Sequence, residues 1–159
     1  MWTYHPNLLA TPVPRYTSYP TAADFGPLED GAIESAIAGA DGDISLYLHI
    51  PFCEKICYYC GCNTAASGKV ARVESYLAAL HQELATVASL LPAGARVRRI
   101  AFGGGSPNAL QPTDFVRLAD ALTLHMPLDN PEWSVEVDPR HLTSAWGTVM
   151  AVVGVTSSF

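Results

Sequence analysis

Three short strand-forming segments alternate with two helix-forming segments between residues 45 and 137, and this order limits the possible folds more than any other feature. Residues 45–50 (SLYLHI), 97–102 (VRRIAF) and 133–137 (WSVEV) are rich in strand formers, and each ends at Pro, Gly or Asp-Pro. Between the first two, a helical face is marked by apolar residues three or four positions apart: Val73, Leu77, Leu80, Leu84, Val87 and Leu91. After Pro112 the spacing of Phe115, Leu118 and Leu122 predicts a second helix.

This alternation predicts an α/β fold whose strands lie parallel and are joined by right-handed crossovers. In parallel α/β folds, functional groups gather at the carboxyl ends of the strands. A cysteine-rich loop follows the first predicted strand, a triple glycine at 103–105 follows the second, and Glu136 lies near the end of the third. We therefore expect these three features to share one edge of the sheet.

The composition of the chain bears on whether it binds nucleic acid, spans a membrane or is secreted. The net charge is −6 and no run of Lys or Arg is present, which argues against nucleic acid as the main partner. No apolar run reaches the ~20 residues that a membrane span needs. The first twenty residues lack the basic and apolar regions of a secretory signal, so we expect a cytoplasmic, reducing location.

All four cysteines lie within ten residues, CEKICYYCGC at 53–62. Disulfides within so short a loop would close very small rings and are disfavoured in a reducing compartment. A structural zinc site usually takes two separated pairs of ligands, and here there is no second pair. Three thiolates in the spacing C-x3-C-x2-C could instead bind three irons of a cubane cluster and leave the fourth iron open. A small zinc knot or unliganded thiols remain alternatives.

The cysteine spacing and the glycines together resemble the radical S-adenosylmethionine (radical SAM) enzymes. The resemblance implies a [4Fe–4S] cluster held by Cys53, Cys57 and Cys60. The open iron would take the amine and carboxylate of S-adenosylmethionine, and an electron donor would supply the electron that cleaves its sulfonium. It also implies a partial (β/α)6 barrel, of which this chain would form an incomplete N-terminal portion.

Four blocks narrow the resemblance to the oxygen-independent coproporphyrinogen III oxidases of haem biosynthesis: PRYTSYPTA at 14–22, LYLHIPFCEKICYYCGCN at 46–63, GGGSPN at 103–108 and EVDPR at 136–140. That family converts two propionate side chains of a porphyrinogen substrate, coproporphyrinogen III, to vinyl groups by oxidative decarboxylation. Arg15 and Arg140 are available to pair with the propionates.

The resemblance also implies roles for single residues. Tyr47, Gly104 and Glu136 would contact a first S-adenosylmethionine, because a side chain at Gly104 would block its methionyl group. Tyr59 matches a family aromatic that packs near the cofactor. Gly105 and Ser106 would approach a second S-adenosylmethionine, although the family more often has Thr at the Ser106 position. Cys62 matches a family cysteine that is not a cluster ligand.

We divide the chain into three parts: an N-terminal extension at 1–44 with a short helix in LEDGAIESAIAG, a partial barrel at 45–140, and a divergent tail at 141–159. The tail has no Asp, Glu, Lys or Arg and shows neither helical periodicity nor a strand pattern. We expect the resemblance to end at Arg140, as it would in a truncated or frame-shifted chain that is inactive alone. Alternative functions are a radical-SAM-like haem chaperone or cluster-binding protein without turnover, a small zinc-binding module, or a gene fragment that does not fold.

Overall fold

The computed structural model describes residues 24–58 and 60–158. The block at 14–22, Arg15 and Tyr59 therefore lie outside the described residues. The chain divides into two units, Met1–Ile33 and Glu34–Phe159. The described part of the first unit contains a turn, in which the Ala32 N–H donates to the Glu29 carbonyl at 3.1 Å, and this turn begins helix α2 (Ala32–Ala38). The candidate site lies in the second unit.

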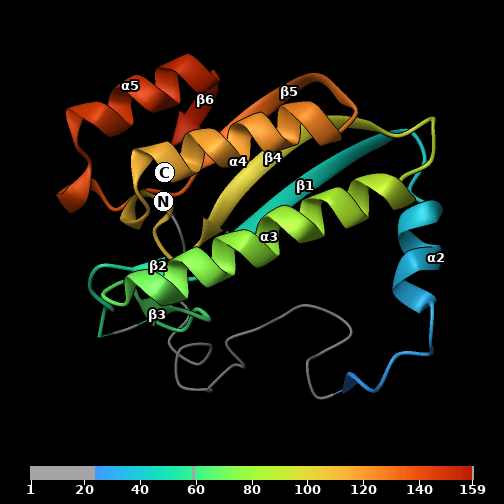
Figure 1. Cartoon of the computed structure of the whole chain (residues 1–159), viewed down its shortest axis with the longest axis horizontal. Coiled ribbons are helices and arrows are strands. Elements are labelled where there is room, and N and C mark those ends of the chain that lie inside the picture. Colours follow the sequence, from blue (N-terminus) through green and yellow to red (C-terminus); the bar gives the residue numbers. More distant parts are fainter. Residues whose placement is uncertain (1–23, 59, 159) are drawn as a thin grey trace, which may run out of the picture. The chain divides into compact units, whose positions relative to one another are not determined.

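The second unit contains a four-stranded sheet in which every neighbouring pair is parallel (Figure 1). Its strands lie in the order β1 (Asp43–Ile50), β4 (Arg96–Gly104), β5 (Leu128–Val135) and β6 (Val155–Ser158). The parallel α/β fold expected from the sequence is thus confirmed. The strands do not close a barrel over the described residues, in agreement with a partial barrel.

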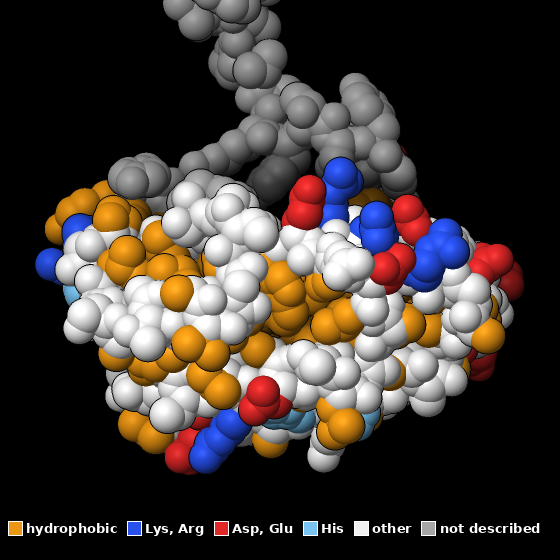
Figure 2. All heavy atoms as spheres, turned by 90° about the horizontal axis from the view of Figure 1, so that it is seen from above, with side chains coloured by type: hydrophobic (Ala, Val, Ile, Leu, Met, Phe, Trp, Pro, Cys, Tyr) orange, Lys and Arg blue, Asp and Glu red, His pale blue; other side chains and the backbone are white. Residues whose placement is uncertain are grey.

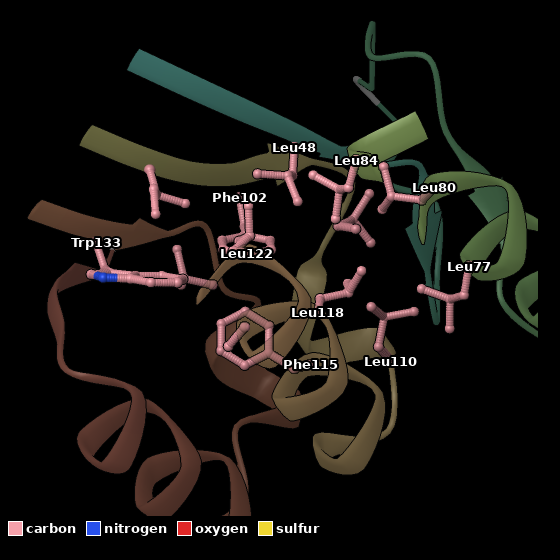
Figure 3. Close-up of a cluster of buried hydrophobic side chains, with 14 of the residues drawn as sticks. Leu48, Leu77, Leu80, Leu84, Phe102, Leu110, Phe115, Leu118, Leu122 and Trp133 are labelled. Carbon is pink, nitrogen blue, oxygen red and sulfur yellow. The ribbon is translucent and has the colours of Figure 1, made fainter. Parts of the chain in front are cut away.

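Helices α3 (Val70–Leu90) and α4 (Pro112–His125) connect the first three of these strands, at the positions that the apolar spacing predicted. Pro112 occupies the first turn of α4, where its missing N–H costs no hydrogen bond. Pro92 follows the end of α3, since it cannot continue a helix. Each helix turns its apolar face toward the sheet, and Figure 3 shows the labelled side chains of strands and helices pointing toward one another.

The core lies between the sheet and these helices. Phe102 on β4 contacts Phe115 on α4 with ring centroids 4.8 Å apart, and Phe115 contacts Trp146 at 5.1 Å. Alternate strand residues enter this core, including Leu48, Ile50, Ile100, Phe102, Trp133 and Val135. The intervening residues therefore project from the opposite face of the sheet, among them Tyr47, His49 and Ser134.

Residues 141–159, whose sequence shows no clear helical or strand pattern, contain both a helix and a strand. They form helix α5 (Ser144–Val153) and strand β6, which pairs with β5. The sequence of α5 shows no clear helical periodicity, because apolar residues occur on most sides of the helix and no polar face contrasts with the buried face. Its ends nevertheless carry ordinary capping residues. Thr143 accepts a hydrogen bond from the Trp146 N–H at 3.3 Å, and Gly154 ends the helix with φ +84°.

Charged side chains are mixed in sign on the surface. Figure 2 shows acidic and basic side chains gathered together near one end of the visible face. At the starting ends of the strands, ion pairs join Arg96 to Asp43 and Arg98 to Asp129, each at 3.0 Å. Within the described part of the chain, no helix has the length and apolarity that crossing a membrane requires.

Candidate functional site

The cysteine loop stands at the carboxyl end of β1 and is closed at its base by a second, two-stranded sheet. Strands β2 (Phe52–Cys53) and β3 (Ala65–Ala66) pair in parallel. The Ala65 N–H donates to the Pro51 carbonyl at 2.6 Å, and the Ser67 N–H donates to the Cys53 carbonyl at 2.9 Å. The loop between the two strands is therefore a closed lobe attached to the main sheet, a feature that the sequence patterns did not predict.

Three of the four cysteines line one hollow. Cys53, Cys57 and Cys60 are partly buried and surround a space of about 710 Å³ together with Ser106 and Arg140. Cys62 is exposed and does not line this space. None of the four forms a disulfide. The structure thus brings together the three cysteines that the resemblance implied as ligands and leaves Cys62 outside the hollow, with its thiol close enough to Cys60 to interact with it. The role of the three as ligands stays a prediction.

The end of β4 is joined to the cysteine loop through backbone hydrogen bonds. The Gly105 N–H donates to the Ile50 carbonyl at 2.8 Å, and the Ser106 N–H donates to the Phe52 carbonyl, also at 2.8 Å. A Cβ added to Gly105 would lie 2.5 Å from that Phe52 oxygen, so a side chain cannot fit there without moving backbone. The Ser106 hydroxyl lies 3.8 Å from the Cys53 sulfur, which places it beside the predicted cluster site.

Gly104 and Glu136 are directly hydrogen-bonded. The Gly104 N–H donates to Glu136 Oε2 at 3.0 Å, and the Glu136 N–H donates to the Phe102 carbonyl at 2.9 Å. Gly104 has φ +103°, a conformation that side chains rarely adopt, and a Cβ there would overlap the His49 ring. The need for glycine at 104 therefore already follows from the fold, in addition to the cofactor approach that the resemblance implied.

Tyr47 lies on the sheet face opposite the core and is 57% exposed. Its hydroxyl lies 3.4 Å from His49 Nδ1. Partial burial raises the pKa of Tyr47, and the charges of Glu136 and Cys62 add smaller increases. Tyr47, Glu136 and Cys62 are thus close enough to interact electrostatically, although Tyr47 does not line the cysteine hollow.

Several polar residues, of which the sequence reasoning had named only Arg140, connect the segment after β5 to the cysteine loop. The 3-10 turn η3 (Pro139–His141) carries Arg140 and His141. Arg140 pairs with Asp138 at 2.7 Å and reaches to 4.0 Å from the Cys57 sulfur. His141 lies between Asp138, at 3.2 Å from Nδ1, and Glu54 of the loop, at 3.1 Å from Nε2.

Asp138 is the centre of this network. The Asn108 side chain, which is buried, donates to the Asp138 carbonyl and accepts from the Asp138 N–H, both at 2.9 Å. Hydrogen bonding to Arg140 holds the pKa of Asp138 well below its usual range, and the same pairing raises the pKa of Arg140. Asn108 and Asp138 both fall within the blocks GGGSPN and EVDPR, which is the signal that could have identified them.

The residues at the hollow fit an iron–sulfur cluster. Thiolates are the ligands that such clusters take, and three of them face one space that is large enough for a group of several atoms. Among the residues that the structure describes, no three His, Cys, Asp or Glu side chains are arranged around a single metal ion. A cluster needs no such arrangement, because each cysteine would bind a different iron.

Comparisons with known proteins agree with these features. No family model matches the chain. It is 43% identical over 150 residues to an oxygen-independent coproporphyrinogen III oxidase of Cereibacter sphaeroides, covering 91% of this chain and 33% of that protein. The enzyme of the same name from Bradyrhizobium diazoefficiens is 39% identical over 149 residues, and that from Escherichia coli is 40% identical over 134. The chain spans about a third of the length of these relatives.

A solved structure gives the same result for the fold. Coproporphyrinogen III oxidase from Escherichia coli, described as a radical SAM enzyme, matches with a TM-score of 0.84 and 33% identity. The match covers 98% of this chain and 36% of that protein, so the likeness of fold continues beyond Arg140, contrary to our expectation. The chain is therefore a homologue of the oxygen-independent coproporphyrinogen III oxidases and corresponds to about one third of their length.

Proposed function

We propose that this chain forms the cluster-binding and S-adenosylmethionine-binding part of an enzyme that decarboxylates coproporphyrinogen III without oxygen. The observation that carries the proposal is the grouping of Cys53, Cys57 and Cys60 around one hollow, next to the glycine-rich end of β4. The relatives that align with this chain are named for this activity. The fold likeness to a radical SAM enzyme supports the cofactor class.

The cofactors would supply the difficult chemistry, namely one-electron reductive cleavage of a sulfonium and removal of hydrogen from the substrate propionate. The residues of this chain bind and orient them. Three thiolates would hold three irons of a [4Fe–4S] cluster and leave one iron open for S-adenosylmethionine. An external one-electron donor is needed, and the four cysteines, none of them in a disulfide, suit a reducing cytoplasmic location.

The edge formed by Gly104 and Glu136 would bind the polar end of S-adenosylmethionine. The Glu136 carboxylate accepts from the Gly104 N–H at 3.0 Å and is suited to accept a second hydrogen bond, from an N–H of the cofactor's amine. Gly104 and Gly105 have no side chain to keep a cofactor from their backbone, and the family resemblance assigns Gly104 to a first S-adenosylmethionine and Gly105 to a second. Ser106, whose hydroxyl lies 3.8 Å from the Cys53 sulfur, would approach the second S-adenosylmethionine, and Tyr47 would contact the first from β1. Tyr59 is proposed to pack near it on the family resemblance alone.

The proposal is tested by reconstituting the whole chain anaerobically with ferrous iron and sulfide and counting both elements. We expect about four irons per chain and brown visible absorbance. Cys53→Ser, Cys57→Ser and Cys60→Ser should each lose most of the cluster. Cys62→Ser is the matched control, because it removes a thiol from the same loop but not from the hollow, and it should keep the cluster.

Two results would contradict the proposal. One is a chain that takes up no iron yet binds one zinc tightly, since a colourless single-ion site would explain the cysteines instead. The other is a loss of iron in Cys62→Ser as large as in the other three variants, because the hollow would then not define the ligand set.

A further inference from the structure

Arg140 extends from the segment after β5 toward the cysteine loop. Its Nη2 lies 2.7 Å from Asp138 Oδ2 and 4.0 Å from the Cys57 sulfur. Its Nε lies 2.9 Å from Asp138 Oδ1, so the planar guanidinium meets the carboxylate through two parallel bonds. This fork geometry fixes the direction of the guanidinium even though the arginine side chain is 57% exposed.

Asp138 is itself held in place, so the direction of Arg140 is preset by the fold. The Asp138 side chain is only 12% exposed. Its backbone N–H and carbonyl both pair with the side chain of Asn108, a residue of the turn η2 (Pro107–Ala109) after β4. The position of the guanidinium therefore depends on the ends of two neighbouring strands rather than on a flexible surface chain.

The same carboxylate also connects to the beginning of the cysteine loop. His141 Nδ1 lies 3.2 Å from Asp138 Oδ2, and His141 Nε2 lies 3.1 Å from Glu54 Oε2. The loop is thus contacted at Glu54 and again at Cys57 by two consecutive residues of η3. This arrangement holds the segment that carries one of the three predicted ligands against the sheet.

We propose that Arg140 is a positioning residue that donates a hydrogen bond to the Cys57 sulfur and favours the reduced state of the cluster. The inference rests on the proposed function, because it requires Cys57 to be a ligand. Hydrogen bonds to cluster sulfurs and nearby charge set the reduction potential of iron–sulfur clusters. The reduced cluster carries one more negative charge than the oxidised cluster, so a fixed cation stabilises the reduced form more. Arginine keeps its charge throughout the working pH range.

The test is an EPR-monitored redox titration of the reconstituted whole chain, in wild type and in Arg140→Met. Removing the cation should make reduction harder and move the midpoint to a more negative potential. We expect the ratio of reduced to oxidised cluster at a fixed potential to fall about tenfold, which is about 59 mV for a one-electron couple. Arg140→Lys keeps the charge, so its midpoint potential should stay close to that of the wild type.

Arg117→Met is the matched control. Arg117 also pairs with an aspartate close in sequence, Asp114 at 3.5 Å, but it lies on α4 and does not line the cysteine hollow. Its replacement removes the same charge from the chain and should leave the midpoint unchanged. Iron content is measured alongside, so that a change in potential is separated from a loss of cluster.

The outcomes separate this inference from the proposed function. A wild-type chain that binds no cluster overturns both. A wild-type cluster whose midpoint is the same in Arg140→Met overturns only the inference. If Arg140→Met loses its cluster, a midpoint potential in Arg140→Lys that matches the wild type supports the inference. If both Arg140 variants lose the cluster while Arg117→Met keeps it, Arg140 has a purely structural role and the inference is overturned.

Discussion

Replacing Gly104 with alanine should lower the free energy of unfolding by about 2–6 kcal/mol. Two costs add at this position. Gly104 has φ +103°, and forcing an L-residue into such a conformation costs about 1–3 kcal/mol. The new Cβ would also overlap the His49 ring, and overpacking of this kind costs about 1–3 kcal/mol.

The overlap cannot be relieved freely, because His49 is held from two sides. Its Nε2 lies 3.1 Å from the Asn63 carbonyl, and its Nδ1 lies 3.4 Å from the Tyr47 hydroxyl. Moving the ring would break contacts to the cysteine loop and to β1. We therefore expect the measured loss of stability to include part of the energy of these contacts as well as the backbone strain.

Two other glycines separate the contributions. Gly154 also has a positive φ, +84°, but a Cβ there meets nothing within 4 Å, so Gly154→Ala should cost only about 1–2 kcal/mol. Gly147 lies inside α5 with open space around it, and Gly147→Ala should stabilise the chain by about 0.5–1 kcal/mol. The difference between the Gly104 and Gly154 variants measures the clash with His49.

The assay is urea unfolding of the apo-chain followed by tryptophan fluorescence, since Trp133 and Trp146 are both buried. Equal stability of wild type and Gly104→Ala would refute the reasoning. So would a Gly104 variant that is no less stable than the Gly154 variant, because the overlap with His49 would then carry no cost.

Two further predictions concern the segment after β5. The pKa of Asp138 is lowered in the folded chain, so its stabilising effect is present above the unfolded value of about 4 and is lost as pH falls. The stability difference between wild type and Asp138→Asn should therefore shrink from pH 6 toward pH 3 in urea titrations, and a difference independent of pH would contradict this. Thr143→Ala removes the N-cap of α5 and should cost about 1 kcal/mol, while Thr148→Ala within the same helix should not destabilise it. Equal losses in thermal unfolding would show that the cap does not stabilise α5.

Most of the fold could be predicted from the sequence, namely those helices and strands that have one buried face and one solvent-exposed face. The apolar residues of α3 recur every three or four positions because α3 packs one face against the sheet. Helix α5 escaped prediction because nearly all its side chains are apolar, although Thr143 and Gly154 mark its ends. Strand β5 begins at Leu128, five residues before the predicted start, because its first half contains Asn130 and Pro131, which are rare in strands.

The candidate site was predictable where chemistry depends on local spacing. Cys53, Cys57 and Cys60 were identified because one short loop supplies all three. The contact between Glu54 and His141 could not be predicted, because it joins segments more than eighty residues apart and depends on how the strand ends meet. The closure of the loop by β2 and β3 was missed for a similar reason, since two-residue strands leave no periodic pattern.

The binding of S-adenosylmethionine at an open iron is the central claim, and EPR tests it most directly. The whole chain is reconstituted with iron and sulfide under anaerobic conditions and reduced, and its spectrum is recorded with and without S-adenosylmethionine. We predict a [4Fe–4S]⁺ signal whose g values change when S-adenosylmethionine is added, because the cofactor would bind the iron that Cys53, Cys57 and Cys60 would leave open. A signal that is identical in both samples, or no cluster signal at all, would contradict it.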